Sequence, residues 1–140
     1  MPKTGIRVGK KKIMKHTIEV DAKTAWQNTG IKCRANQKIK IVANHDSKWT
    51  ANPATGKYGA AGINIVAKPY YCLPGAHEGA LVGNFMGEHH SHPFSVSTHY
   101  EGQVPFDCEL HLSINDDVPG HYGAGFKDNE GFMKVEIELL

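Results

Sequence analysis

Short oxygen-bearing side chains gather near the end of the chain, in the stretch SINDDVPGHYGAGFKDNEGF. Asp116 and Asp117 follow an apolar run, and Asp128 and Asn129 precede the next one. Carboxylates that lie close together repel one another, and a divalent cation between them removes that repulsion. Calcium binds about six to eight oxygens from carboxylates, amides, carbonyls and water, and glycines allow the backbone to turn its carbonyls inward. The stretch therefore predicts a site for a hard cation such as Ca²⁺.

The same composition is also that of an ordinary turn, because Asp, Asn and Gly all favour tight bends. The register of an EF-hand loop, in which a glutamate occupies the twelfth position, does not occur in this stretch. Composition alone therefore leaves two interpretations open, a cation site and a plain polar hairpin loop.

The elements that must position these side chains are strands, because apolar residues recur with a period of two rather than 3.6. Residues 79–85 form a short apolar run that suits an inner strand, and residues 21–26 are long enough for one helical turn at most. Gly- and Pro-rich turns separate the runs, which favours an all-β fold, an antiparallel sandwich or barrel. The runs with alternating or nearly alternating apolar residues are residues 13–20, 38–44, 94–100, 108–114 and 132–139.

The length of 140 residues predicts a single domain spanning residues 1–140. The net charge of +2 is too small for a typical nucleic-acid-binding protein. The basic residues 1–12 lack interleaved aromatic residues, so we interpret them as a half-ordered, solubilising lead-in. The sequence has neither a signal-peptide core nor an apolar run that would insert into a membrane. We therefore expect a cytoplasmic location, although export to the cell surface by a route without a signal peptide would leave no trace.

Cys33, Cys72 and Cys108 are odd in number and widely spaced, which indicates neither a zinc site nor a disulfide scaffold. We predict that Cys33 and Cys108 are small buried hydrophobic residues. Trp26 and Trp49 are predicted to be large apolar side chains between the sheets.

The segment GEHHSHP contains Glu88, His89, His90 and His92, a combination that can form a hydrolytic zinc site with a glutamate base. The HExxH spacing of such sites on a helix is missing, so a polar surface loop is the favoured interpretation. No catalytic triad and no phosphate-binding loop can be identified either. The chain is therefore predicted not to be an enzyme.

The segments INDDVPGHYG and DNEGFMKVEI resemble the C-terminal signature of the calcium-dependent, galactose-binding bacterial lectins of the PA-I (LecA) type. Three upstream segments, WQNTGIKCRANQKIKIVA, KWTANPATGKYGAAG and GALVGNF, resemble further parts of these lectins in the same order. The similarity spans roughly residues 18–139. It implies a jelly-roll-like β-sandwich of the galactose-binding-domain type, in which one calcium ion bridges the protein and two vicinal sugar hydroxyls.

The resemblance also implies a set of calcium ligands. It assigns the side chains of Asp128 and Asn129, the main-chain carbonyls of Asn52 and His121, and one aspartate at the end of the preceding strand. The strand register makes that aspartate Asp116, whereas counting back from Val-Pro-Gly makes it Asp117, so both stay candidates.

The implied sugar contacts overlap with the calcium ligands. The chain lacks the His-Pro-x-Gln element with which these lectins bind the outer sugar hydroxyls, and Lys68, Tyr70 and Tyr71 are its candidate replacements. The complete implied sugar-binding set is Asn52, Asp116, Asp117, Val118, His121, Asp128, Lys68 and Tyr70.

The implied partners are galactose-terminated glycans, with no nucleic acid and no membrane insertion. Because single sites of this kind are weak, we expect a homo-oligomer, a dimer or a tetramer, that gains avidity. An edge strand and residues 135–140 are candidate subunit contacts. The alternative is a calcium-stabilised β-sandwich that serves as a structural or protein-interaction module and binds no sugar.

Overall fold

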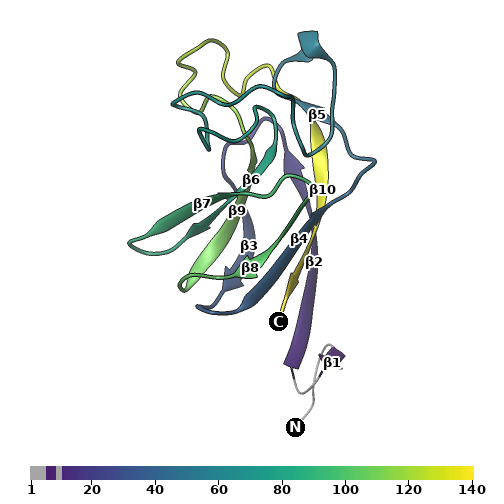
Figure 1. Cartoon of the computed structure of the whole chain (residues 1–140), viewed down its shortest axis with the longest axis vertical. Coiled ribbons are helices and arrows are strands. Elements are labelled where there is room, and N and C mark those ends of the chain that lie inside the picture. Colours follow the sequence, from purple (N-terminus) through teal and green to yellow (C-terminus); the bar gives the residue numbers. More distant parts are fainter. Residues whose placement is uncertain (1–5, 9–10) are drawn as a thin grey trace.

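Two antiparallel sheets pack face to face in the computed structural model, which describes residues 6–8 and 11–140 (Figure 1). The first sheet has the order β1-β2-β10-β4-β8, with the short β5 paired to β10, and the second has the order β3-β9-β6-β7. This arrangement confirms the predicted all-β antiparallel sandwich. The strands are β1 (Ile6–Val8), β2 (Lys11–Asp21), β3 (Gln27–Cys33), β4 (Lys38–Ala43), β5 (Trp49–Thr50), β6 (Leu81–Met86), β7 (Ser91–Ser95), β8 (His99–Gln103), β9 (Cys108–Ile114) and β10 (Glu130–Leu139).

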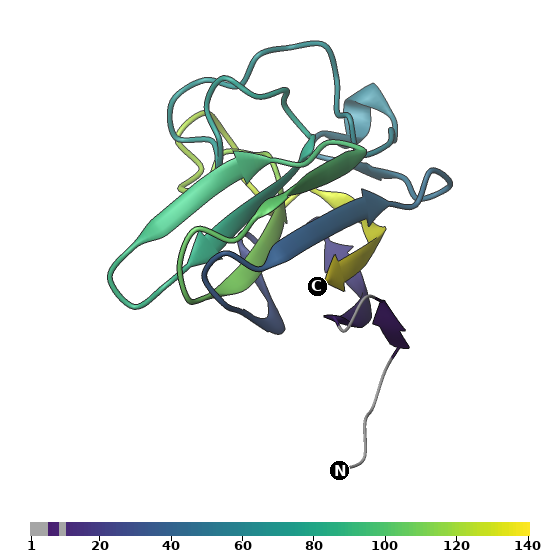
Figure 2. The same cartoon turned by 60° about the horizontal axis from the view of Figure 1, so that its bottom comes forward.

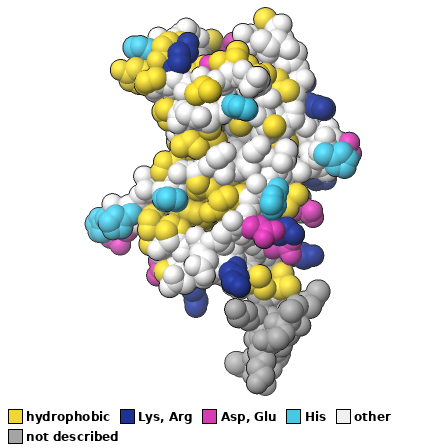
Figure 3. Space-filling model, in the orientation of Figure 1, with side chains coloured by type: hydrophobic (Ala, Val, Ile, Leu, Met, Phe, Trp, Pro, Cys, Tyr) yellow, Lys and Arg dark blue, Asp and Glu magenta, His cyan; other side chains and the backbone are white. Residues whose placement is uncertain are grey.

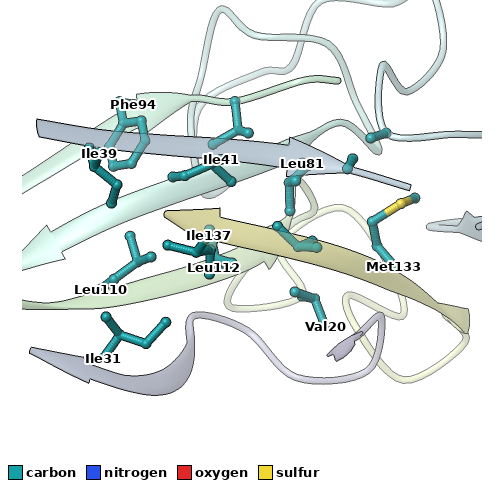
Figure 4. Close-up of a cluster of buried hydrophobic side chains, with 14 of the residues drawn as sticks. Val20, Ile31, Ile39, Ile41, Leu81, Phe94, Leu110, Leu112, Met133 and Ile137 are labelled. Carbon is teal, nitrogen blue, oxygen red and sulfur yellow. The ribbon is translucent and has the colours of Figure 1, made fainter. Parts of the chain in front are cut away.

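The core lies between the two sheets because alternate residues of each strand point inward. In β10, Val135 and Ile137 are fully buried, whereas Lys134 and Glu136, which lie on either side of Val135, are exposed. Figure 4 shows aliphatic side chains from both sheets meeting in this layer. Each buried aliphatic side chain of this size contributes about 2 kcal/mol of transfer free energy.

The alternating residues 94–100 do not form one strand, so that prediction is wrong. The strand β7 ends at Ser95, Ser97 adopts a left-handed backbone with φ 58°, and β8 begins at His99 in the other sheet. The apolar alternation continues through the turn because Val96 is buried at the point where the chain crosses between sheets. A period of two therefore does not distinguish a straight strand from a strand that ends in a crossing turn.

The two tryptophans have different roles. Trp49 is fully buried, and its indole N–H donates to the Gly79 carbonyl at 2.9 Å, as expected for a core residue. Trp26 is only half-buried, and its backbone is left-handed, with φ 48°, in the turn between β2 and β3. The prediction that Trp26 fills the core is therefore wrong.

The C-terminal segment 135–140, a candidate for subunit contacts, is not a free sheet edge, so it could contribute only its outward-facing side chains. The strand β10 lies between β2 and β4 and forms backbone pairs with both. The edge strands of the two sheets are β1, β8, β3 and β7.

Residues 1–5 and 9–10 of the basic lead-in lie outside the described residues. The short β1 pairs with the start of β2 in antiparallel register. No helix in the described part of the chain is long and apolar enough to span a membrane.

The long loops lie at one end of the sandwich, and the start of β2 and the end of β10 lie at the other end (Figures 1 and 2). The loop end contains residues 51–80 and residues 115–129. Because β9 and β10 both meet this end, the two halves of the acidic stretch start and finish there.

Candidate metal and ligand-binding site

The acidic residues at the end of β9 are buried, which is unusual for carboxylates. Asp116 and Asp117 are 5% and 3% exposed, and Asn129, which directly precedes β10, is fully buried. The backbone of residues 116–118 pairs with residues 70–72: the Cys72 N–H donates to the Asp116 carbonyl at 3.0 Å, and Tyr71 and Asp117 form an isolated β-bridge. This pairing extends the sheet into the loop and holds both carboxylates in place.

Each of these three side chains uses one end for anchoring. The Asp116 carboxylate accepts a hydrogen bond from the Asp117 N–H at 2.7 Å, and the Asp117 carboxylate accepts one from the Tyr122 N–H at 2.6 Å. The Asn129 amide donates to the Ala22 carbonyl at 2.8 Å.

The remaining oxygens of these side chains, Asp116 Oδ2, Asp117 Oδ1 and Asn129 Oδ1, are buried and have no hydrogen-bond partner. A buried polar atom without a partner costs about 1–3 kcal/mol, and more when it is charged. Three such oxygens from the two strand ends form the donor set that a hard cation binds. The residues present therefore fit a calcium ion.

Burial, together with the nearby carboxylates of Asp128 and Asp117, raises the pKa of Asp116 to about 6. Asp128 lies at the exposed rim of the loop, whereas the other two carboxylates lie beneath it. The structure thus brings together the four side chains that the sequence singled out at the two ends of the stretch.

Asn115 positions this loop, and the sequence reasoning did not identify it as important. Its side-chain oxygen accepts from the Leu73 N–H at 2.9 Å, and its amide donates to the carbonyls of Leu73 and His77, both at 3.0 Å. These bonds hold the loop segment 73–77 against the end of β9. The only signal in the sequence was an amide directly after an apolar strand, which is also common in plain turns.

Asn115→Ala is expected to destabilise the protein by about 2–3 kcal/mol, because it removes three hydrogen bonds and leaves the Leu73 N–H without a buried partner. Chemical denaturation of the two proteins measures the difference. Asn44→Ala, an exposed asparagine whose side chain accepts only the Asp46 N–H, is the control and should change stability much less. Equal losses for both variants would contradict the anchoring role.

A pocket of about 290 Å³ opens above the buried carboxylates. One wall carries Asp116, Asp117 and Asp128, and the opposite walls come from the loops after β5 and before β6. The lining residues are Ala51, Asn52, Thr55, Tyr58, Ile63, Ile65, Tyr71, Glu78, Asp116, Asp117, Tyr122, Gly123, Ala124, Gly125 and Asp128. The pocket therefore combines acidic, hydroxyl and aliphatic surfaces.

Asn52 lies in the pocket wall, but its carbonyl is engaged within its own turn. It accepts hydrogen bonds from the hydroxyls of Thr50 and Thr55, both at 2.8 Å, and from the Thr55 N–H at 3.0 Å. Its side chain accepts from the Ala54 N–H and begins the 3-10 turn Pro53–Thr55. By contrast, the His121 carbonyl accepts no hydrogen bond from any residue that the structure describes. Of the two predicted carbonyl ligands, only that of His121 is free of local partners.

An aromatic cluster lies beside the outer end of the acidic loop. The rings of Tyr70 and His121 stack with centroids 4.2 Å apart, and Lys68 Nζ lies 4.4 Å from the centre of the Tyr122 ring. The exposed Val118 is tied to this cluster, because its N–H donates to the Tyr70 carbonyl at 2.9 Å. Lys68 and Tyr70 do not line the pocket, and their part in replacing the His-Pro-x-Gln element stays a prediction.

Tyr71, the third candidate for a sugar contact, is part of the pocket wall. Burial and the carboxylates of Glu78 and Asp116 raise the pKa of Tyr71. The Tyr71 hydroxyl therefore stays protonated at neutral pH and can donate a hydrogen bond to a ligand.

Comparison with known proteins gives a clear likeness to solved structures. No protein-family model and no curated protein matches the sequence. The N-terminal domain of EclA, described as a PllA-like lectin, superimposes with a TM-score of 0.61 at 23% identity, over 89% of this chain and 95% of that chain. The chain has the fold of this lectin domain. At this level of identity the likeness establishes the fold but not the ligand, which has to be inferred from the chemistry of the site.

The histidine-rich segment lies far from the acidic loop of this lectin fold. His89 and His90 are exposed in the turn between β6 and β7, and Figure 3 shows histidine side chains at the tip where that hairpin projects. Among the described residues, no three His, Cys, Asp or Glu side chains are grouped closely enough to hold a metal ion. The hairpin therefore offers no zinc site there, and a cation at the acidic loop must also use amide and main-chain oxygens.

The calcium-free protein is expected to lose stability as the pH rises from 4 to 7. The pKa of Asp116, about 6, lies above its ordinary value of 3.8, so the stabilising protonated form is fully populated below pH 4 and disappears through pH 6. The loss amounts to about 3 kcal/mol. Denaturation of the wild type and of Asp116→Asn in chelator, at several pH values across this range, isolates the contribution of the Asp116 carboxyl. If the stability of both proteins changes with pH in the same way, the prediction is wrong.

Proposed function

We propose that this chain is a non-enzymatic, calcium-dependent carbohydrate-binding protein that recognises terminal galactose or a similar vicinal-diol sugar. The observation that carries the proposal is the set of three buried, partnerless oxygens on Asp116, Asp117 and Asn129 beneath an open pocket. Asp128 at the rim and the free carbonyl of His121 complete the candidate ligands. The fold that the chain shares with a lectin domain supports the same function.

Bound calcium would supply the positive charge that attracts two neighbouring sugar hydroxyls. The chain's own residues prepare this contact, because the anchored ends of Asp116, Asp117 and Asn129 fix the direction of their free oxygens. Little rotamer entropy is then lost when a ligand binds.

The walls of the pocket suit the remaining surface of a sugar ring. Tyr71 and Glu78 offer a hydrogen-bond donor and an acceptor, and Ile63 and Ile65 offer apolar contact for the C–H groups of the ring. The cluster around Tyr70 extends the contact surface beyond the pocket. Since the His-Pro-x-Gln element is missing, these groups take over the recognition of the outer hydroxyls.

A homo-oligomer, dimer or tetramer, is the form in which we expect the protein to act, because joining weak sites raises avidity by about 10²–10⁴. The edge strands β3, β7 and β8 present unpaired backbone that suits such an association. Light scattering coupled to size-exclusion chromatography measures the number of subunits.

A second candidate function is a calcium-stabilised module that binds no sugar. The partnerless oxygens favour it equally, because they require a cation and do not by themselves require a carbohydrate. Both candidate functions use the same pocket, so only a test for sugar binding distinguishes them.

A glycan array probed with calcium and with chelator distinguishes the two candidates. Binding to galactosides that disappears with chelator supports the lectin, whereas calcium-dependent thermal stability without any glycan signal supports the structural module. The double variant His89→Ala/His90→Ala is the control and should retain calcium and glycan binding, since both side chains are exposed on the β6–β7 turn. The proposal of calcium binding fails if calorimetry detects no calcium uptake at millimolar concentration.

A further inference from the structure

Two of the three cysteines face each other across neighbouring strands, although they are far apart in the sequence. Cys33 is the last residue of β3, Cys108 is the first residue of β9, and the two are direct partners in the antiparallel register. Opposite residues in such a pair have Cα atoms about 4.5–5.5 Å apart. This separation falls within the range of about 4.4–6.8 Å that a disulfide requires.

The two side chains also point to the same side of the sheet. Cys33 and Cys108 are 3% and 9% exposed, whereas their neighbours Lys32 and Glu109 are more exposed. Burial, followed by the neighbouring Cys108 thiol, raises the pKa of Cys33 to about 12. The thiols therefore interact with each other as well as with the core.

The third cysteine provides a natural comparison. Cys72 is buried elsewhere in the fold, and its sulfur lies 3.4 Å from the Ser113 hydroxyl. No other cysteine is paired with it in the described chain.

A small molecule can approach the Cys33–Cys108 pair from the surface. Both residues line a shallow hollow of about 500 Å³, together with Lys32, Arg34, Asp107 and Glu109. The hollow carries the basic side chains of Lys32 and Arg34 together with the acidic side chains of Glu88, Asp107 and Glu109, so it offers partners for both charged ends of a zwitterionic molecule. A small disulfide that carries both ammonium and carboxylate groups, such as glutathione disulfide, suits this mixed surface.

We propose that Cys33 and Cys108 form a cross-strand disulfide by thiol–disulfide exchange with such a small-molecule disulfide. One cysteine loses its proton to solvent, attacks a sulfur of the oxidant and expels one thiolate, which leaves a mixed disulfide on the protein. The second cysteine, also deprotonated, attacks the protein-bound sulfur and expels the second thiolate. The two cysteines are thereby oxidised, the oxidant is reduced to two thiols, and the two protons are taken up by the expelled thiolates.

The disulfide would fasten the edge strand β3 to β9 and close a long loop, so it stabilises the fold. The other end of β9, which leads into the acidic loop, lies about 20 Å away along the strand. The bond should therefore raise stability without changing calcium or glycan binding, and it stands independently of the proposed function.

The test incubates the reduced, folded protein with glutathione disulfide and counts free thiols after denaturation. The wild type should fall from three thiols to one, and Cys72→Ser should fall from two to none. Cys33→Ala and Cys108→Ala should form no intramolecular disulfide. Oxidation should raise the Tm of the wild type by about 10 °C, and a reductant should reverse the rise.

Peptide mapping of the oxidised wild type decides the result even if a cysteine variant fails to fold. A cross-link between the peptides that contain Cys33 and Cys108 supports the proposal. Retention of all three thiols, a cross-link that involves Cys72, or a disulfide between two chains would overturn it.

Discussion

Asp116→Asn is expected to weaken calcium binding by at least about 100-fold and yet to stabilise the calcium-free protein by about 2 kcal/mol at pH 7. The substitution removes the charge of a carboxylate that burial holds at a raised pKa of about 6. It keeps the oxygen that accepts the Asp117 N–H. The Asn129 side chain adjoins Asp116, so the new amide can also donate to its partnerless oxygen. Isothermal calorimetry measures the calcium affinity, and urea denaturation in chelator measures the stability.

Asp46→Asn is the matched control, because the Asp46 side chain is 83% exposed and lies outside the pocket. It should change neither calcium affinity nor stability appreciably. If Asp116→Asn binds calcium as tightly as the wild type, the buried carboxylate is not a ligand. If it binds weakly but is also less stable without calcium, burial of the charge is not what destabilises the calcium-free fold.

Gly131→Ala is expected to destabilise the protein by about 3–4 kcal/mol, because it combines backbone strain with a steric clash. Gly131 has φ +96°, and a Cβ there would lie 2.6 Å from the Lys48 carbonyl and 2.9 Å from the Trp49 Cα. The clash would push β10 away from β5, with which Gly131 pairs through Trp49. Since Asn129 lies two residues earlier, calcium binding should weaken as well.

Gly75→Ala separates the two causes. Gly75 has a similar φ of +93°, but a Cβ there meets no atom within 4 Å. It should therefore cost only the strain, about 1 kcal/mol. Thermal and urea denaturation of both variants measure the difference, and equal losses would mean that the close approach of β5 to β10 does not matter.

The sheet architecture was readable from the sequence where one face of a strand is buried. The alternation in residues 132–139 identified β10 because its inward residues are aliphatic and its outward residues are charged. The same reasoning failed at Val96, where burial continues through a turn between the sheets. It also gave no clear strand at β3, whose first half is polar and contains Gly30 at φ +78° within an irregular register.

The candidate site was only partly readable in the same way. Asp116, Asp117, Asp128 and Asn129 were recognisable by residue type, because hard cations prefer short oxygen-bearing side chains. The anchoring by Asn115, the partnerless state of three oxygens and the engaged carbonyl of Asn52 depend on contacts between distant segments. The pairing of Cys33 with Cys108 depends on strand register, which spacing along the chain does not contain.

The loops and the end of β10 lie at opposite ends of the sandwich. This placement determines how the protein would be oriented when it is immobilised on a surface. The strand β10 carries the chain from Glu130 beside the pocket to Leu139, about 30 Å away. A tag or a linker attached after Leu140 would leave the pocket facing away from a solid support (Figure 1). Molecules immobilised through this end on a bead or sensor chip would all be oriented with the acidic loop toward the solution.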